Sequence, residues 1–496
     1  MNRNADKRIR KRYLAGSILI GTGTFALLGL GEPFLAVAVL TTFAAVASML
    51  TRPAVAGAVL AATSVANAAS VLTEFYGIPS ITEPLMALAV LSIAISSIRS
   101  AISVQLPQPA LVLALGGYVA VQLASIFWAD DPVAATGVTV GTIRDILIAL
   151  VVVATIGSVG DLLVVIGGIA SAGVFLAALS VHQAITGSYS SPYGGFAVAT
   201  IEQIVGEVDD WRASGPFDDP NFFAQVLVVA FSLSLVCAVF SQSRRARMSG
   251  LAGAVVSGFG VVVTFSRGGT LALLAVCVCV VALRRPRPIW TMAAIAIVLV
   301  SAAALPSDFT SRVTQSTAGL PLVGGDQPIA DSAVRGRASE GIVGLQMFVD
   351  HPLVGVGAGN YAVNYQDYSR ELGLDPRRQD RKSHNVYVEI ASETGLLGLS
   401  AFAAITAIAV QSLRTASRSL GERTRLSARS LIVGGAGLAV TSIFLHADFA
   451  RTLWIMVALS ATVGTLERAP VARFDLTDEV DGADELSSGE RARVST

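Results

Sequence analysis

A histidine stands just before an apolar stretch, near the end of a long polar segment of the sequence. His384 is followed by Asn385, and the block continues through Glu389 and Glu393 to Gly395, where we expect a stop or bend before residues without charge. An unperturbed imidazole titrates near neutral pH, so it can accept a proton from a reacting hydroxyl. The positive end of a helix that starts after Asn385 favours the neutral ring. The alternative is a structural role in which His384 only caps this helix.

Arginines in two other segments are candidates for binding an anion. Arg267 lies in a Ser-Arg-Gly-Gly-Thr run between two apolar stretches, and Arg335 and Arg337 begin an expected helix in the polar segment. A guanidinium binds phosphate oxygens through two parallel donors and keeps its charge at any relevant pH. Two arginines that converge from different segments would suit a pyrophosphate at the membrane surface. The alternatives are an interfacial arginine at a tight helical hairpin for Arg267 and a solvated surface arginine for Arg337.

A third polar group is the run from Asp218 through Asp219 and Pro220 to Asn221. These side chains can orient an acceptor sugar or cap a helix that starts near Phe222, and the pattern favours capping.

The composition places these residues on a membrane protein. The chain has 496 residues, 53% of them hydrophobic and only 14% charged, and this is too apolar for a soluble globular protein. Most charge-free windows approach the ~20 residues that span a bilayer as a helix. The windows are 13–31, 33–51, 53–73, 85–98, 110–127, 146–160, 162–183, 221–240, 248–266, 268–283, 289–305, 395–413, 430–447 and 452–466. The sequence therefore predicts an all-α polytopic membrane protein with about 12–14 transmembrane helices.

The distribution of charge predicts how the chain crosses the membrane. If the basic N-terminus is cytoplasmic, fourteen crossings put every purely basic cluster inside and every acidic loop outside. The expected regions are a basic cytoplasmic N-terminus (1–12), transmembrane helices with an external loop at 184–220 (13–305), a large external catalytic loop (306–394), C-terminal transmembrane helices (395–466) and a disordered, acidic cytoplasmic tail (467–496). The expected location is the inner, plasma membrane, with the large loop on the external, periplasmic side and both termini cytoplasmic. A loop this long is expected to carry function.

The remaining histidines and the cysteines favour no metal or nucleotide site. His351 precedes a proline and is expected to shape a turn, whereas His182 and His446 carry no supporting pattern. No Cys/His ligand spacing, phosphate-binding glycine loop or strand-helix nucleotide motif is present in the sequence. The cysteines all lie inside apolar windows, where they suit packing: Cys237, Cys277 and Cys279.

Four segments, taken in order, resemble the bacterial O-antigen ligase and O-antigen polymerase family. They are Gly215-Pro216-Phe217 with Pro220-Asn221-Phe222-Phe223-Ala224, then Ser266-Arg267-Gly268-Gly269, then Arg337 with His351-Pro352-Leu353-Val354-Gly355-Val356-Gly357, and finally His384-Asn385 with Glu389, Glu393, Gly395 and Gly398. The last block is fairly specific, and the order of all four strengthens it. The family often has an aromatic residue four positions after the loop arginine, where this chain has Gly341. The sequence therefore leaves open whether Arg335 or Arg337 is the counterpart.

The resemblance implies a GT-C-like, metal-independent, inverting membrane glycosyltransferase without a cofactor. Its donor would be a glycan on a polyprenyl diphosphate, and its acceptor a glycan, glycolipid or protein; its surroundings would be the lipid bilayer, and no nucleic acid would take part. His384 would take or orient the proton of the acceptor hydroxyl, whereas Arg267 and Arg337 would bind the diphosphate. The expected substrate contacts are Arg335, Asn385, Asn221, Asp218 and Glu389. Ligase and polymerase differ in the acceptor, which the motifs do not distinguish.

Two other classes of function stay open at the level of sequence. A multi-helix secondary transporter would hold ionisable residues near mid-membrane on broken helices, whereas the candidates here gather at the expected external face. A non-catalytic membrane protein could bind glycan without turnover. Substitution of His384, with binding and turnover both measured, distinguishes a binder from an enzyme.

Overall fold

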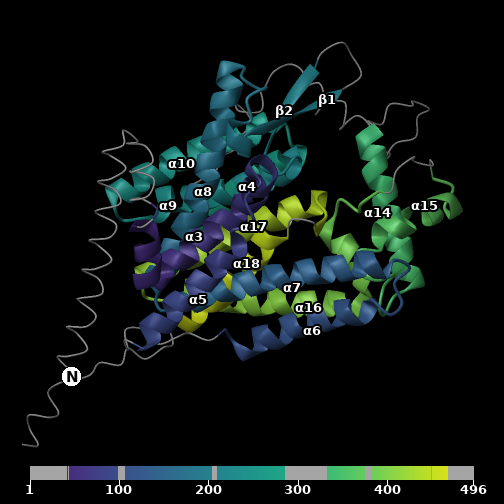
Figure 1. The fold of residues 1–496 in the computed structure, drawn as a ribbon, viewed down its shortest axis with the longest axis horizontal. Helices are drawn as coiled ribbons and strands as arrows, with labels where there is room; N and C mark the ends of the chain where they lie inside the picture. Colours follow the sequence, from purple (N-terminus) through teal and green to yellow (C-terminus); the bar gives the residue numbers. More distant parts are fainter. Residues whose placement is uncertain are drawn as a thin grey trace, which may run out of the picture.

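A computed structural model describes most of the chain between residues 42 and 466. The described residues are 42, 44–98, 107–203, 209–284, 332–374, 381–447 and 450–466, with the backbone alone at 202, 203, 209, 210 and 332–335. The long helices lie side by side in a bundle, and a small β-hairpin lies at its upper edge in Figure 1.

Helices dominate the described chain, as the composition predicts. Six are long and apolar enough to cross a membrane: α7 (Pro132–Ala154), α8 (Val159–Thr186), α9 (Pro220–Phe240), α10 (Arg244–Val263), α16 (Val386–Ser417), and α17 (Glu422–Thr441) with the 3-10 turn η2 (Ser442–Phe444). Four shorter apolar helices accompany them: α5 (Thr82–Ile98), α6 (Pro109–Ser125), α11 (Arg267–Leu283) and α18 (Arg451–Leu466). The helix Ala44–Thr51 and α3 (Pro53–Val65), bent by 119°, form one further candidate span. The prediction of an all-α polytopic membrane protein is confirmed.

The predicted window 53–73 is broken into two helices, α3 and α4 (Ala68–Tyr76). Asn67 lies between them in a left-handed conformation with φ 49°. Its side-chain Nδ2 donates a hydrogen bond to the carbonyl oxygen of Pro216 at 2.8 Å. The break therefore anchors the segment that leads into α9.

Part of the predicted topology lies outside the described residues. The structure does not describe the windows 13–31 and 289–305, most of the window 33–51, or the tail 467–496. The number of 12–14 spans, the boundaries of the five regions and the side of the membrane on which each loop lies therefore stay predictions.

Polar residues just before apolar runs set where two of the long helices begin. The side chain of Asp131 caps α7 and that of Asp219 caps α9, each by accepting hydrogen bonds from two backbone N–H groups of the first turn. In both cases a proline follows at the first helical position, where no N–H donor is needed. Such a cap typically contributes ~1 kcal/mol. The favoured interpretation of the 218–221 run as a helix cap is confirmed for Asp219.

The predicted loop 184–220 contains a β-hairpin that the sequence pattern did not indicate. Strands β1 (Val198–Gln203) and β2 (Asp209–Gly215) pair antiparallel, with Thr200 opposite Arg212. Neighbouring residues of a strand point to opposite faces. On one face Trp211 stacks on Tyr189 with ring centroids 5.6 Å apart, while Arg212 reaches the turn between α10 and α11.

The polar segment before α16 forms two helices joined by a glycine-rich turn. They are α14 (Ser332–Asp350) and α15 (Tyr361–Glu371), and both lie at one end of α6, α7 and α16 in Figure 1. The predicted helix from about 336, which ends at the turn after Asp350, is confirmed. His351 lies in this turn, where its N–H donates to the carbonyl of Met347 at 3.0 Å.

The glycine-rich turn crosses α16 where that helix is interrupted. Gly395 has φ 61° and ψ −160°, which are not helical values. Beside this break the N–H of Val356 donates to the carbonyl of Ser392 at 2.9 Å. A Cβ atom at Gly355 or Gly395 would collide with the backbone that crosses it, so only glycine fits at either position. The predicted bend at Gly395 is confirmed.

The bundle holds a buried ion pair between α7 and α18. The Nε atom of Arg451 lies 2.9 Å from Oδ1 of Asp145, and the two side chains are 18% and 9% exposed. Ionisable residues at membrane depth are expected to pair in this way.

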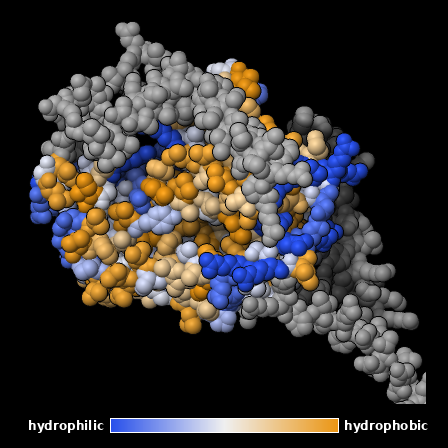
Figure 2. All heavy atoms as spheres, turned by 180° about the vertical axis from the view of Figure 1, so that it is seen from behind, coloured by the Kyte–Doolittle hydropathy of each residue, from blue (hydrophilic) through white to orange (hydrophobic). Residues whose placement is uncertain are grey.

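The outer surface of the helices is extensively hydrophobic and is bordered by hydrophilic residues (Figure 2). The three cysteines are free thiols in α9 and α11.

Candidate active site

The turn between α10 and α11 holds Arg267 beside the start of α9. Phe265 has a positive φ of 50°, and Ser266 then caps α11 by accepting a hydrogen bond from the N–H of Gly269 at 3.2 Å. The Ser266 hydroxyl donates to Oδ1 of Asn221 at 2.9 Å. The structure thus brings together two predicted site residues, because Arg267 is the first residue of α11.

A further arginine reaches this turn from the β-hairpin. The side chain of Arg212 is buried, and its Nε donates to the carbonyl oxygen of Thr264 at 3.0 Å. Nothing in the sequence singled out Arg212, because only the pairing of β1 with β2 carries it to the turn. The neighbouring residues Asp209-Asp210-Trp211 form no motif that could have found it.

Arg337 extends from α14 toward the same group of side chains. Burial lowers the pKa of its guanidinium from the ordinary arginine value, and the positive charges of Arg267 and Arg212 lower it further. The carboxylates of Glu340 and Asp219 raise it in opposition. Arginine keeps its proton after such a shift because its ordinary pKa is so high. Three guanidinium groups against two carboxylates form a site that attracts an anion with several oxygens.

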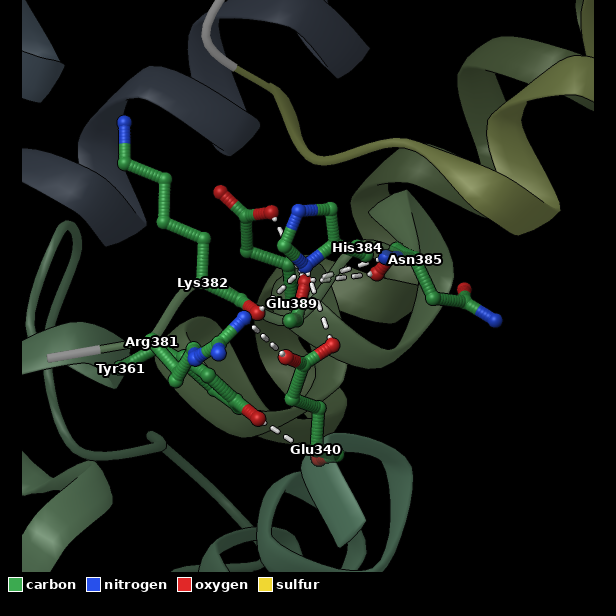
Figure 3. A network of polar contacts seen from close by, with 8 residues as sticks. Glu340, Tyr361, Arg381, Lys382, His384, Asn385 and Glu389 are labelled. Atoms are coloured by element: carbon green, nitrogen blue, oxygen red, sulfur yellow. Dashed lines mark hydrogen bonds and ion pairs between the residues drawn. The ribbon is translucent and has the colours of Figure 1, made fainter. Parts of the chain in front are cut away.

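The predicted catalytic histidine lies beside an acidic residue of α14. Nδ1 of His384 is 3.0 Å from Oε2 of Glu340 and also 3.0 Å from the carbonyl oxygen of Lys382 (Figure 3). The His384 side chain is 27% exposed, whereas Glu340 is 2% exposed. His384 is therefore held at one ring nitrogen and still accessible. Glu340 was missed from the sequence, although it follows Arg337 by one helical turn.

The buried carboxylate of Glu340 has a second partner. A guanidinium nitrogen of Arg381 lies 3.7 Å from Oε1, so the two carboxylate oxygens face different cationic or donor groups (Figure 3). The backbone of α14 is fixed at this point as well, because the Tyr361 hydroxyl donates to the carbonyl oxygen of Glu340 at 2.6 Å. Burying a carboxylate is costly unless such partners compensate it.

A second histidine packs against His384. The ring centroids of His384 and His446 lie 5.3 Å apart in an edge-to-face arrangement, and His446 in turn contacts Phe222 at 4.9 Å. His446 is buried in the segment between η2 and α18. No sequence pattern supported a role for His446, because this contact joins two segments that lie far apart in the chain.

Two of the predicted substrate contacts serve the local structure. Asn385 is the N-cap of α16, where its Oδ1 accepts hydrogen bonds from two backbone N–H groups. Glu389 accepts from the Ser383 hydroxyl at 3.0 Å and from the N–H of Ala447 at 3.1 Å. Glu389 thereby ties the segment that carries His384 to the segment that carries His446.

The last two predicted substrate contacts are less defined. Asp218 is exposed and has a positive φ of 53°, just before the cap of α9. Arg335 lies on α14, and its side chain is outside the described residues. The substrate contacts of Asp218 and Arg335 stay predictions.

Part of the site lies in a segment that matches a known family. Residues 252–403 match the family model described as O-antigen ligase, from α10 through α14 to the part of α16 beyond Gly395. The matched residues make up less than half of the 496-residue chain, so the chain is similar to the O-antigen ligase family over this segment. Together with the long apolar helices of the described residues, the match supports a multi-pass membrane protein that resembles O-antigen ligases in this segment. No curated protein shows a significant match to the sequence.

The O-antigen ligase segment supplies only part of the site. Arg267, Arg337, Glu340 and His384 lie inside the matched residues 252–403. The remaining neighbours come from β2, from the start of α9 and from the segment after η2: Arg212, Asn221, Phe222 and His446. The site is therefore a product of the whole described bundle and not of the matched segment alone.

Proposed function

We propose that this protein transfers a glycan from polyprenyl diphosphate to an acceptor hydroxyl at the external face of the membrane. The proposal rests on two neighbouring groups of side chains. One is the arginine cluster of Arg212, Arg267 and Arg337. The other is the pair of His384 and Glu340, and Glu340 lies one turn of α14 after Arg337. A glycosyl transfer from a diphosphate needs both parts: a cationic site for the leaving group and a base for the nucleophile.

The arginines suit the leaving group of this reaction. As the anomeric carbon–oxygen bond breaks, its electron pair stays on the diphosphate and negative charge develops there. Guanidinium groups held in a partly buried site stabilise that charge without having to reorganise. Arg337 suits this role best of the three. Burial and the positive charges of Arg267 and Arg212 lower its pKa, and a bound anion would offset the repulsion among these three charges.

His384 suits the nucleophile. Its ring accepts the proton of the acceptor hydroxyl while that oxygen bonds to the anomeric carbon from the side opposite the diphosphate. The products are the elongated or glycosylated acceptor and polyprenyl diphosphate, and the proton on the ring is returned to solvent. A single displacement of this kind inverts the anomeric configuration, and no nucleotide or cofactor enters the balance.

The external location rests on the distribution of charge. On the predicted topology, the purely basic clusters lie on the cytoplasmic side, which leaves the turn at Ser266 and the segment of α14 and α15 on the other side. The grouping of α14 and α15 at one end of the long helices supports one shared face for these elements (Figure 1).

The experiment is a transfer assay in proteoliposomes with polyprenyl-diphosphate-linked glycan and a chelator present. Wild-type protein is expected to release polyprenyl diphosphate, and Arg337→Ala is expected to abolish most of this release. The exposed residue Arg370, whose side chain is 66% accessible on α15, provides the matched control Arg370→Ala. Donor that is bound but never consumed would favour a glycan-binding protein, and donor moved across the bilayer intact would favour a transporter; either result would overturn the proposal.

The size of the product then separates two members of the class. Repeated addition to a lipid-linked acceptor gives a ladder of products and indicates a polymerase. A single transfer to a glycolipid or protein acceptor indicates a ligase. Both use the same donor chemistry, so the arginine and histidine substitutions are expected to impair either one.

A further inference from the structure

We propose that Glu340 is the positioning residue of the catalytic histidine: its carboxylate holds the hydrogen on Nδ1 of His384 and so presents Nε2 as the base. The inference rests on the proposed function for its catalytic meaning. The contact itself, a hydrogen bond between a buried carboxylate and an imidazole nitrogen, is a property of the fold. It can be measured without any turnover.

The two neighbours of Nδ1 decide where the ring hydrogen lies. One is the carboxylate oxygen of Glu340 and the other is the carbonyl oxygen of Lys382, each 3.0 Å away. Both are hydrogen-bond acceptors, so Nδ1 must be the donor. In a neutral imidazole the other nitrogen, Nε2, then carries the lone pair that accepts a proton.

The Glu340 carboxylate is held as an acceptor by its surroundings. It is 2% exposed, and Arg381 lies 3.7 Å from the oxygen that does not face the histidine. Arg337 is close enough for the carboxylate to raise the pKa of its guanidinium. These positive charges compensate the cost of burying a carboxylate.

The ring is also fixed on other sides. His384 has a positive φ of 45°, which is uncommon for a residue other than glycine and sets the direction of its side chain. Asn385 caps α16 directly after it, and the ring of His446 packs edge-to-face at 5.3 Å. The imidazole therefore has little freedom to rotate and exchange its two nitrogens.

The chemical consequence is limited to orientation and charge. When Nε2 takes the proton of the acceptor hydroxyl, the ring becomes an imidazolium and Nδ1 keeps its hydrogen. Glu340 stays a carboxylate throughout and stabilises the positive ring, as the acidic member of a hydrolase triad does. No further atom or electron is exchanged between the two residues.

A kinetic comparison tests the role in turnover. Glu340→Gln is expected to lower kcat by roughly 100-fold or more, because the amide can also donate and no longer fixes the tautomer. The KM for the lipid-linked donor should stay within about twofold, since Glu340 binds no part of the donor. Glu371 is exposed on α15, and Glu371→Gln replaces a carboxylate by an amide in the same way. This variant is the matched control and should leave kcat unchanged. A fall in donor affinity with kcat retained would overturn the proposal.

The tautomer is measured directly by ¹⁵N NMR of histidine-labelled protein, with the His384 signals assigned from a His384→Gln sample. Wild type is expected to show hydrogen on Nδ1 and none on Nε2 of the neutral ring, and Glu340→Gln to show a mixture. Hydrogen on Nε2 in the wild type would overturn the inference even if Glu340→Gln failed to fold. If wild type shows the Nδ1 tautomer yet consumes no donor, the proposed function fails while the Glu340–His384 arrangement stands.

Discussion

Oε2 of Glu340 lies 3.0 Å from Nδ1 of His384, although the two residues are 44 positions apart in the chain. The whole of α15 and the glycine-rich turn lie between them in sequence. The contact therefore depends on how that intervening segment folds back onto α16. Substitutions in the turn therefore test this contact as well as substitutions of Glu340 or His384 do.

The first prediction concerns Gly355, where the turn crosses α16. Alanine there must adopt φ 68° and place its Cβ against the backbone of Glu393 and Thr394. The left-handed conformation alone costs ~1–2 kcal/mol, and the collision adds to it. Gly355→Ala should lower the melting temperature in detergent and lower turnover with it. The matched control is Gly341→Ala in α14, whose Cβ would meet no atom within 4 Å. Equal melting temperatures for the two variants would contradict the crossing as described.

The second prediction separates two roles of Asn385. If it only caps α16, Asn385→Asp keeps the acceptor oxygen and should preserve both stability and turnover, whereas Asn385→Ala should lose ~1 kcal/mol of stability. If its amide contacts substrate, as the sequence suggested, Asn385→Asp should lose turnover while the melting temperature holds. The cap geometry predicts the first pattern.

The sequence was sufficient to predict most of the helices, but it did not predict which side chains from different helices and strands come into contact. Charge-free windows, the Asp219-Pro220 cap and the glycine at 395 are local signals. The structure confirms that most windows among the described residues are helical, and it confirms the cap and the bend. Arg212, Glu340 and His446 carry no local signal. Each reaches the site through a contact between elements distant in the chain: a strand pairing, a turn packed on α16 and the end of α17.

The third prediction concerns recognition of the diphosphate. Arg337→Ala should weaken donor binding by roughly 10- to 100-fold, since a charged hydrogen bond contributes about 1.5–3 kcal/mol. Arg337→Lys should fall between alanine and wild type, because lysine keeps the charge but loses the two-pronged geometry. Donor affinity in Arg337→Ala that equals that of the Arg370→Ala control would show that this arginine binds no donor.

The fourth prediction concerns the ion pair inside the bundle. Asp145→Asn leaves Arg451 without its partner at 2.9 Å, so the protein should lose about 3–5 kcal/mol of stability, the usual cost of breaking a buried pair. Adding Arg451→Gln should recover part of that loss. The measurement is a double-mutant cycle on unfolding in detergent, and strictly additive effects of the two substitutions would argue against a direct pair.

Arg335 is the other candidate for the donor-binding arginine of the polar segment. Its backbone lies two residues before Arg337 on α14, and Arg337 is the one of the two whose side chain is among the described residues. Parallel alanine substitutions of both arginines, measured by donor binding, decide which one the substrate contacts.

The central claim is that the arginines bind the donor and His384 performs the proton transfer, and parallel measurement of donor binding and turnover in His384→Ala tests it most directly. The account predicts donor affinity within about twofold of wild type and a turnover lower by roughly 10²–10⁴-fold, the usual contribution of a general base. Turnover equal to wild type, or donor binding lost together with turnover, would contradict it.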